Sequence, residues 1–263
     1  MSNGTVTSVT THHRAAGHPD TSSATTPGRA RTVARVTGLA YLGIIATGVF
    51  AEFAVRGSLV VDDDPIETAA NIAGSPGLFG AGVGADVAMV VFDAIVAFGL
   101  FRLLRHVDRR LALTATVLRL IQGAVIAVNL LVLVSALGHA QDTVTANGTV
   151  LPGPAQEALD AIERHALGYD IGLIAFGLSC LAVGRLLQVS RLTPRLLAFG
   201  MYATGTVYLV GSFAAAFAPD LSAAIDPFYG IALATELWFA LLLITKGLRT
   251  PAAALPRPIT TVV

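Results

Sequence analysis

Charged side chains inside long apolar segments are the residues of this sequence best suited to do chemistry. Charge at membrane depth is costly, so such groups usually face the interior of a helix bundle or a water-filled cavity. Carboxylates gathered there can bind a proton or a small cation and pass it on. The candidate cluster consists of Glu52, Asp86, Asp93, Arg119, Asp170 and Glu236, with the neutral residues Gln122 and Asn129.

The second and third apolar segments are joined by a short polar connection and therefore form an antiparallel hairpin. If the chain turns near residues 107–108, Asp93 faces Gln122 and Asp86 faces Asn129. Arg119 lies one helical turn from Gln122, on the same face. We therefore expect a polar seam along the hairpin, in which Arg119 can reach Asp93.

Arg119 is the only cation expected at membrane depth, and Glu236 is its second possible partner after Asp93. One interpretation is that the polar residues only fix helix packing through ion pairs and hydrogen bonds. The other is that they line a hydrated path. Exposure near the outer segment ends would explain Glu52 and Asp170, but Glu236 lies near the middle of its segment.

Six apolar segments must position these residues, and each is about 20 residues long or slightly longer. A helix rises about 1.5 Å per residue, so about 20 residues cross a hydrocarbon core of about 30 Å. The pattern predicts an all-α fold, a polytopic membrane protein built as a six-transmembrane-helix bundle. The segments are Val36–Val55, Gly82–Leu104, Leu111–Leu137, Ala166–Leu187, Leu196–Phe217 and Phe228–Thr245.

Positive charge sets the expected orientation. Of the 17 Lys and Arg residues, all but Arg56, Arg119 and Arg164 lie on the two tails or at alternate connections. The positive-inside rule therefore predicts a multi-pass plasma-membrane protein with both termini in the cytoplasm. Acidic residues favour the external loops, and the formal net charge is zero. The bilayer is the expected partner, and no nucleic-acid partner is expected.

Composition divides the chain into a transmembrane domain and two tails. Residues 1–30 are polar and predict a disordered cytoplasmic tail, residues 31–249 the six-helix domain, and residues 250–263 a cytoplasmic C-terminal tail. In the first external loop, Asp64-Pro65-Ile66-Glu67 predicts a capping box that starts a short helix to about Ala73. Residues 155–165 predict an amphipathic helix that lies at the outer surface or leads into the fourth segment.

Motifs of common enzymes and metal sites are missing from the sequence. Cys180 is the only cysteine, and no Cys/His spacing suits a metal, so neither a metal nor a cofactor is expected. A lipid-modifying membrane enzyme would need His or Ser beside acids at the membrane surface. Only His139 and His165 are available for that role.

One short sequence occurs twice. Thr37–Leu42 (TGLAYL) in the first segment resembles Thr204–Leu209 (TGTVYL) in the fifth, and both segments run in the same direction. An internal repeat would indicate the symmetry found in transporters. The alternative is chance, because the shared alphabet is small and the flanking residues do not continue the match.

Residues 35–249 resemble the bacterial family called domain of unknown function 4386. The resemblance rests on Arg35–Leu42 (RVTGLAYL), Thr68–Ile72 (TAANI) and Leu118–Gln122 (LRLIQ). With Glu67, the residues Thr68 and Asn71 form a candidate motif of the external loop. The family implies a six-span membrane protein and supplies no activity, and the composition is similar to that of high-GC actinobacteria.

Three function classes remain open. The leading hypothesis is a non-enzymatic membrane protein that binds or transports a small solute, a cation or protons through a carboxylate-lined cavity. The second is a structural or regulatory membrane protein whose polar residues only stabilise helix packing. The third, a lipid-modifying enzyme, has the least support. The oligomeric state stays open.

Overall fold

The computed structural model describes residues 27–143 and 151–248, which form helices joined by short connections, with no strand in these ranges. The first transmembrane helix is assembled from three consecutive helical pieces, and two short helices lie between the longer ones. The elements are α1 (Pro27–Val49), η1 (Phe50–Arg56), α2 (Gly57–Leu59), α3 (Pro65–Gly74), α4 (Pro76–Leu104), α5 (Arg109–Asp142), α6 (Pro152–Ser190), α7 (Arg195–Phe217), α8 (Pro219–Ile225), η2 (Asp226–Phe228) and α9 (Tyr229–Thr245).

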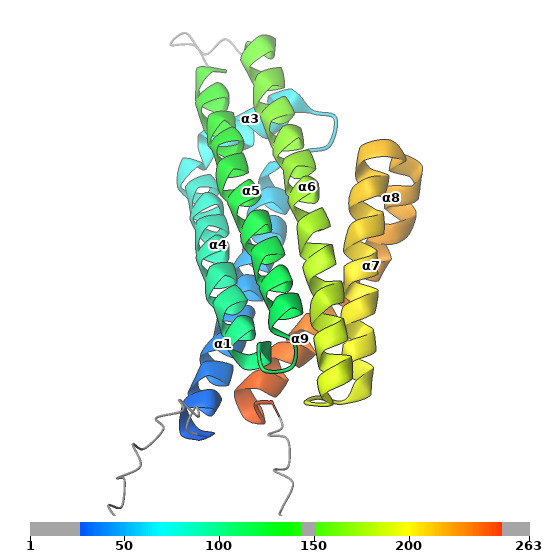
Figure 1. Cartoon of the computed structure of the whole chain (residues 1–263). Coiled ribbons are helices and arrows are strands. Elements are labelled where there is room, and N and C mark those ends of the chain that lie inside the picture. The colour runs from blue at the N-terminus through cyan, green and yellow to red at the C-terminus, as the bar shows by residue number, and fades with distance from the viewer. Residues whose placement is uncertain (1–26, 144–150, 249–263) are drawn as a thin grey trace, which may run out of the picture.

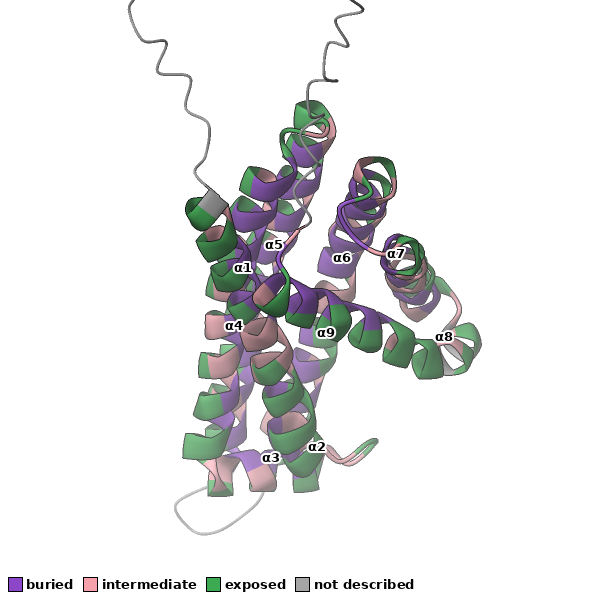
Figure 2. Cartoon of the chain, turned by 90° about the horizontal axis from the view of Figure 1, so that it is seen from below, coloured by how far each residue is buried: buried purple, intermediate pink, exposed green. Residues whose placement is uncertain are grey.

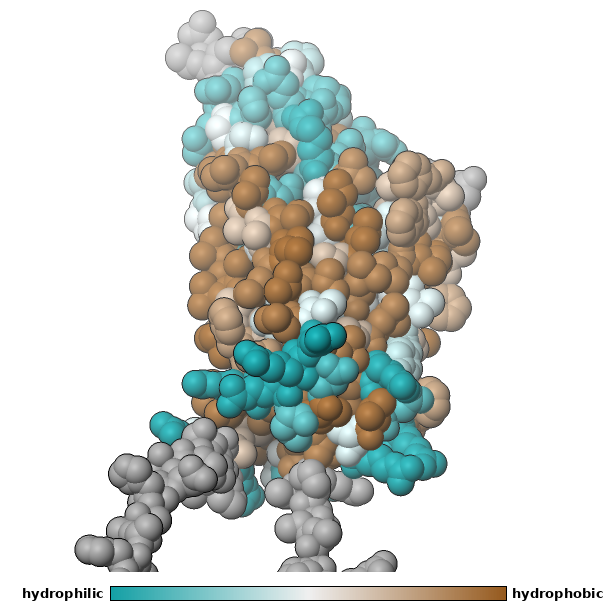
Figure 3. All heavy atoms as spheres, viewed as in Figure 1, coloured by the Kyte–Doolittle hydropathy of each residue, from teal (hydrophilic) through white to brown (hydrophobic). Residues whose placement is uncertain are grey.

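Six helices are long and apolar enough to cross a membrane, which confirms the predicted all-α fold with six transmembrane helices. All six predicted apolar segments lie inside them. A broad hydrophobic band covers the middle of the molecule and separates two hydrophilic ends (Figure 3). The six helices cover Gly28–Leu59, Pro76–Leu104, Arg109–Asp142, Pro152–Ser190, Arg195–Phe217 and Asp226–Thr245.

The first of these helices is longer than the sequence predicted. It begins at Pro27, inside the expected tail of residues 1–30, and it continues past Val55 to Leu59. The segment Phe50–Arg56 is π-helical, a wider turn that occurs mostly as a local bulge and often at functional sites. Because the helix does not stop at Val55, Arg56 is part of a transmembrane helix.

The six long helices form a closed ring. α1 packs on α4, α4 on α5, α5 on α6, α6 on α7, α7 on α9, and α9 on α1 (Figure 1). The buried faces of these helices turn toward one another and the exposed faces turn outward (Figure 2). The larger hydrophobic core therefore lies along the inside of the bundle, with Tyr41, Phe176 and Phe239 among its aromatic members.

Arginines gather at one end of the bundle, which we call the arginine-rich end. The start of α1, the α4–α5 turn, the α6–α7 turn and the end of α9 all lie there (Figure 1). In the α4–α5 turn, Asp108 accepts a hydrogen bond from the backbone N–H of Leu111 at 3.0 Å and so caps α5. This short turn keeps α4 and α5 antiparallel.

The opposite end carries a second hydrophobic core. α5 has 34 residues and α6 has 39, so they extend about 51 Å and 58 Å and exceed a membrane core of about 30 Å. α3 lies across their ends (Figure 1). We call this part the cap. Its core contains Leu59, Ile72, Phe79, Leu133 and Ala158.

Both helices that the sequence predicted for this end are present. Residues 155–165 form the first turns of α6 and lead directly into the membrane segment, the second of the two expected arrangements. α3 begins with Pro65 at its first position, and Asp64 accepts a hydrogen bond from the Glu67 N–H at 2.9 Å, as the capping motif predicted.

Candidate functional site

Each of the six long helices contributes one side chain to a chain of contacts inside the bundle, which we call the central cluster. Successive members touch through an ion pair, hydrogen bonds or aromatic contacts. Its members are Tyr41 from α1, Asp93 from α4, Arg119 from α5, Phe176 from α6, Tyr208 from α7 and Glu236 from α9.

The Arg119 guanidinium contacts three other members of the cluster, Asp93, Tyr41 and Phe176. Its Nε donates to Asp93 Oδ1 at 2.6 Å, and the two side chains are only 2% and 5% exposed. The predicted pairing of Arg119 with Asp93 is therefore confirmed. Arg119 Nη1 also donates to the Tyr41 hydroxyl at 3.3 Å. A buried ion pair needs such further bonds, since its desolvation penalty is several kcal/mol for each ion.

Aromatic rings enclose the same guanidinium. The Arg119 Cζ lies 4.9 Å from the centroid of the Tyr41 ring and 4.6 Å from that of Phe176, both within cation–π range. The Phe176 ring meets the Tyr208 ring edge-on, with 5.1 Å between centroids. Phe176 therefore links the cation to the far side of the cluster, while Arg119 Nη2 has no hydrogen-bond partner among the described residues.

Glu236 closes the chain of contacts. Its Oε2 accepts a hydrogen bond from the Tyr208 hydroxyl at 3.4 Å, and the side chain is buried. The carboxylate also lies within electrostatic range of Arg119 and Asp93. Among the described residues, neither Glu236 Oε1 nor Asp93 Oδ2 has a hydrogen-bond partner. One guanidinium thus faces two buried carboxylates, each with one free oxygen.

The two copies of the repeated hexapeptide meet in this cluster. Tyr41 is the fifth residue of the copy in α1, and Tyr208 is the fifth residue of the copy in α7. Both tyrosines are bonded to charged members of the cluster. The two tyrosines have opposite roles, since Tyr41 accepts a hydrogen bond and Tyr208 donates one, and the internal repeat stays a prediction.

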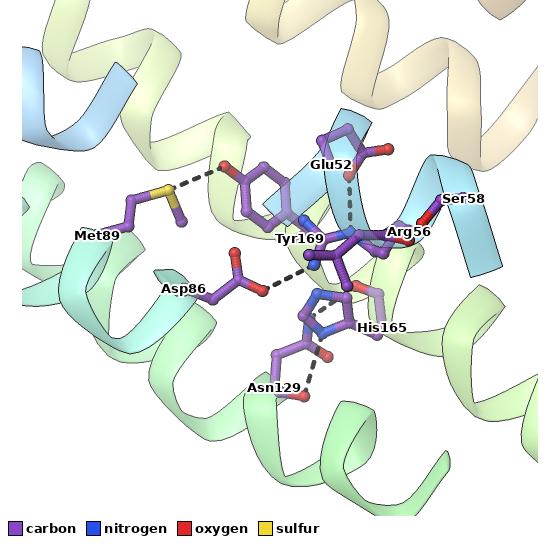
Figure 4. Close-up of polar contacts among 9 residues, drawn as sticks. Glu52, Arg56, Ser58, Asp86, Met89, Asn129, His165 and Tyr169 are labelled. Carbon is purple, nitrogen blue, oxygen red and sulfur yellow. Dashed lines mark hydrogen bonds and ion pairs between the residues drawn. The ribbon is translucent and has the colours of Figure 1, made fainter. Parts of the chain in front are cut away.

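A second polar group, the boundary cluster, lies where the membrane segments meet the cap. Arg56 donates from Nε to Glu52 Oε2 at 2.8 Å and from Nη1 to Asp86 Oδ2 at 2.7 Å. Figure 4 shows both carboxylates pointing toward Arg56, with Tyr169 and His165 beside it. Arg56 and Asp86 are 14% and 2% exposed, whereas Glu52 is 62% exposed.

A second arginine, Arg56, therefore lies on a transmembrane helix and pairs with predicted members of the polar cluster. Arg56 was assigned to a loop because the hydropathy pattern ends at Val55, but the π-helical segment carries it toward α4. Glu52 and Asp86 consequently have a cationic partner. The sequence signal was present, because Glu52 and Arg56 are four residues apart, the spacing of an ion pair on one helix.

The predicted partner of Asp86 across the hairpin bonds elsewhere. Asn129 Nδ2 donates to the His165 carbonyl oxygen at 2.7 Å and lies 3.0 Å from His165 Nδ1 (Figure 4). Asp86 and Asn129 were predicted to face each other, but among the described residues they form no hydrogen bond with each other. Asp86 pairs instead with the longer side chain of Arg56. Asn129 has a backbone acceptor on the neighbouring helix α6.

Two predicted residues stay outside both networks. Gln122 is buried, and its Oε1 has no hydrogen-bond partner among the described residues. Asp170 is half-buried on α6 and lies within electrostatic range of Asp226. No ion pair involving Asp170 is found in residues 27–143 and 151–248, so of the five predicted acids, Asp170 and Glu236 lack a cation there.

The external-loop motif fastens α3 to the end of the first long helix. The Thr68 hydroxyl accepts from the Val61 N–H at 2.9 Å and donates to the Val61 carbonyl at 3.1 Å. Asn71 Nδ2 donates to the Leu59 carbonyl at 3.3 Å. These bonds satisfy backbone groups in the α2–α3 connection, so Thr68 and Asn71 hold the cap together.

The two histidines considered for an enzyme are also engaged. His139 Nδ1 lies 3.0 Å from Glu157 Oε2 at the surface of the cap. His165 is bonded to Asn129, and the Ser58 hydroxyl donates to the carbonyls of its own helix at Ala54 and Val55. Within the described ranges, no serine hydroxyl is bonded to a histidine.

Comparison with known proteins identifies the family of the chain. Residues 36–247 match the family model Domain of unknown function (DUF4386). The chain belongs to this family. The match covers all six long helices and both polar clusters of this DUF4386 chain, from Val36 on α1 to Gly247. No curated protein and no solved structure matches the chain.

The predicted tails lie almost entirely outside the described residues. Residues 1–26 and 249–263 are not described, so the predictions of a disordered N-terminal tail and a C-terminal tail remain predictions.

Proposed function

We propose that this chain is a non-enzymatic protein of the plasma membrane that binds and transfers a proton at the carboxylates of the central cluster. The observation that carries the proposal is the charge count around Arg119. One guanidinium pairs with Asp93 and is only within electrostatic range of the second buried carboxylate, Glu236, and each carboxylate keeps one oxygen without a partner among the described residues.

The charge imbalance favours a bound cation or proton. Asp93 is compensated by Arg119, whereas Glu236 receives a hydrogen bond from the neutral hydroxyl of Tyr208. An unpaired charge in a membrane interior is costly, and ionisable groups there commonly serve as proton relays. A proton on Glu236 balances the charges of the cluster and needs no additional space.

The size of the internal space favours a proton over a larger solute. The cavity beside Arg119, bordered by Thr116 and Ser179, has a volume of about 10 Å³. A site of roughly 10–15 Å³ holds a single water molecule. An organic solute would require the helices to separate, whereas a proton bound to a carboxylate needs no such space.

We propose that the arginine-rich end faces the cytoplasm, with both termini on that side and the cap outside. The distribution of Lys and Arg supports this orientation through the positive-inside rule. In this arrangement the boundary cluster lies on the outer side of the central cluster. Tyr169 on α6 is within electrostatic range of both Asp86 and Glu236.

A structural role is the second candidate, favoured by a different observation. The contacts of the central cluster run through all six long helices, so the same residues that bind a proton also hold the ring closed. In that case the polar groups stabilise helix packing and transfer no proton.

Proton flux in reconstituted liposomes separates the two candidates. Purified full-length protein is placed in liposomes with an internal pH dye, and an outside-acid gradient is imposed on wild type, Glu236→Gln and Glu163→Gln. Glu163 is an exposed acid on α6 and serves as the matched control. We expect wild type and Glu163→Gln to acidify the interior and Glu236→Gln to lose most of the flux. Equal flux in all three, or none in wild type, contradicts proton transfer and leaves the packing role.

A further inference from the structure

A groove on the outer face of the α4–α5 hairpin leads to the central ion pair. It has a volume of about 140 Å³, much larger than the cavity inside the bundle. Asp93 and Arg119 lie at its floor. Its walls are apolar and mostly small: Val90, Ala94, Leu120, Gly123, Ala124 and Ala127.

The groove opens toward the bilayer. Ala124 and Ala127 are exposed on the outward face of α5, within the apolar part of that helix. Arg119 lies about 15 Å along the helix axis from the start of α5 at Arg109, at 1.5 Å per residue. This distance is about half the thickness of a hydrocarbon core, so the groove lies near the middle of the membrane.

An unsatisfied acceptor lies behind the groove wall. Asp93 Oδ1 binds Arg119, but Asp93 Oδ2 is buried and has no hydrogen-bond partner among the described residues. A Cβ atom added at Gly123 would lie 3.9 Å from this oxygen, so Gly123 is the groove residue beside it and has no side chain to cover it. A buried polar atom without a partner is destabilising, and a donor in the groove would relieve this cost.

The charges around the groove limit what can supply that donor. Arg119 already compensates Asp93, and it would repel a second cation placed beside it. Charged head groups are also costly at mid-membrane depth. An uncharged hydroxyl can donate to the free oxygen at no such cost, and the apolar walls suit a hydrocarbon body.

We propose that this groove binds an uncharged, membrane-dissolved alcohol whose hydroxyl donates to Asp93 Oδ2 and whose hydrocarbon part lies against Leu120, Ala124 and Ala127. The ligand must carry a hydrogen-bond donor, have no charge and have an apolar body. The groove shares Asp93 with the proposed proton transfer, but the two proposals are tested separately, because alcohol binding is measured without any flux and does not depend on Glu236.

Photolabelling of the full-length protein in detergent tests the proposal. The probe is an octanol that carries a diazirine, and labelled residues are mapped by mass spectrometry. We expect labelling within residues 120–127, displaced by 1-octanol about tenfold better than by octyl methyl ether, which has the same shape but no donor. Tenfold corresponds to about 1.4 kcal/mol, in the range of one hydrogen bond. Equal displacement by the two competitors would overturn the hydroxyl assignment.

Two variants at lipid-facing positions of the same helix locate the site. Ala124→Phe fills the groove and is expected to abolish the labelling, whereas Val117→Phe changes an exposed position outside it and is expected to leave the labelling intact. Neither change touches the packed interior, so both proteins are expected to fold. Unchanged labelling in Ala124→Phe would show that the alcohol binds elsewhere and would refute the proposal.

Discussion

Tyr41 accepts a hydrogen bond from the Arg119 guanidinium at 3.3 Å, while Tyr208 donates one to the Glu236 carboxylate at 3.4 Å. The two tyrosines occupy the same position of the repeated hexapeptide in α1 and α7. A phenol can act in both ways because its hydroxyl is donor and acceptor. The same residue type therefore serves a cation in one half of the cluster and an anion in the other.

Removal of Arg119 is expected to destabilise the protein more than removal of the whole pair. Arg119→Leu leaves Asp93 buried and uncompensated, a change that lowers stability by roughly 3–5 kcal/mol. Adding Asp93→Asn removes the orphaned charge and is expected to restore part of the loss. Thermal unfolding in detergent measures both. If the effects of the single changes simply add in the double variant, the two residues are not coupled.

The two bonds of Arg56 are expected to differ in strength. Asp86→Asn weakens a buried ion pair, whereas Glu52→Gln changes a side chain that is 62% exposed and screened by its surroundings. We expect Glu52→Gln to lie within about 1 kcal/mol of wild type and Asp86→Asn to be clearly more destabilising. Equal unfolding temperatures for the two variants would mean that Asp86 is solvated in the native protein.

Close packing of α6 against α7 depends on a glycine. A Cβ atom on Gly205 would lie 2.6 Å from the Gly177 carbonyl oxygen, and a backbone atom of a packed helix cannot move aside. Gly205→Ala is therefore expected to lower stability by about 1–3 kcal/mol. Gly80 on α4 has open space around it, so Gly80→Ala is the matched control, and its unfolding temperature is expected to equal or exceed that of wild type. A reversed order would contradict the helix contact.

Membrane orientation is expected to follow the arginines. In a Cys180→Ser background, Gln156→Cys places a thiol on the exposed surface of the cap, and His106→Cys places one in the α4–α5 turn. A membrane-impermeant maleimide is expected to label residue 156 in intact cells and residue 106 only after lysis. The opposite pattern would invert the proposed topology.

Sequence reasoning predicted the membrane helices well because the bilayer itself fixes their minimum length and composition. It predicted the Arg119–Asp93 pair because a short turn between antiparallel helices sets the register. It could not place the ends of α5 and α6, since a helix that leaves the bilayer need not stop there. In the sequence, polar residues resume before α5 and α6 end. The position of Arg56 on the first long helix was missed for the same reason.

The partners of Glu236 were beyond the reach of the sequence. Its contact with Tyr208 joins α7 to α9, two helices separated by α8 and η2, and no local spacing fixes their register. The enclosure of Arg119 by Phe176 likewise depends on how α5 and α6 are rotated about their axes. Such contacts are set by the closure of the whole ring, to which every helix contributes.

The unbroken length of α5 and α6 has a mechanical consequence. Because both helices run from the arginine-rich end into the cap with no described break, the cap has no hinge of its own and must move with them. A molecule that tilts the cap would therefore also tilt the membrane-spanning parts of α5 and α6, which carry Arg119 and Phe176.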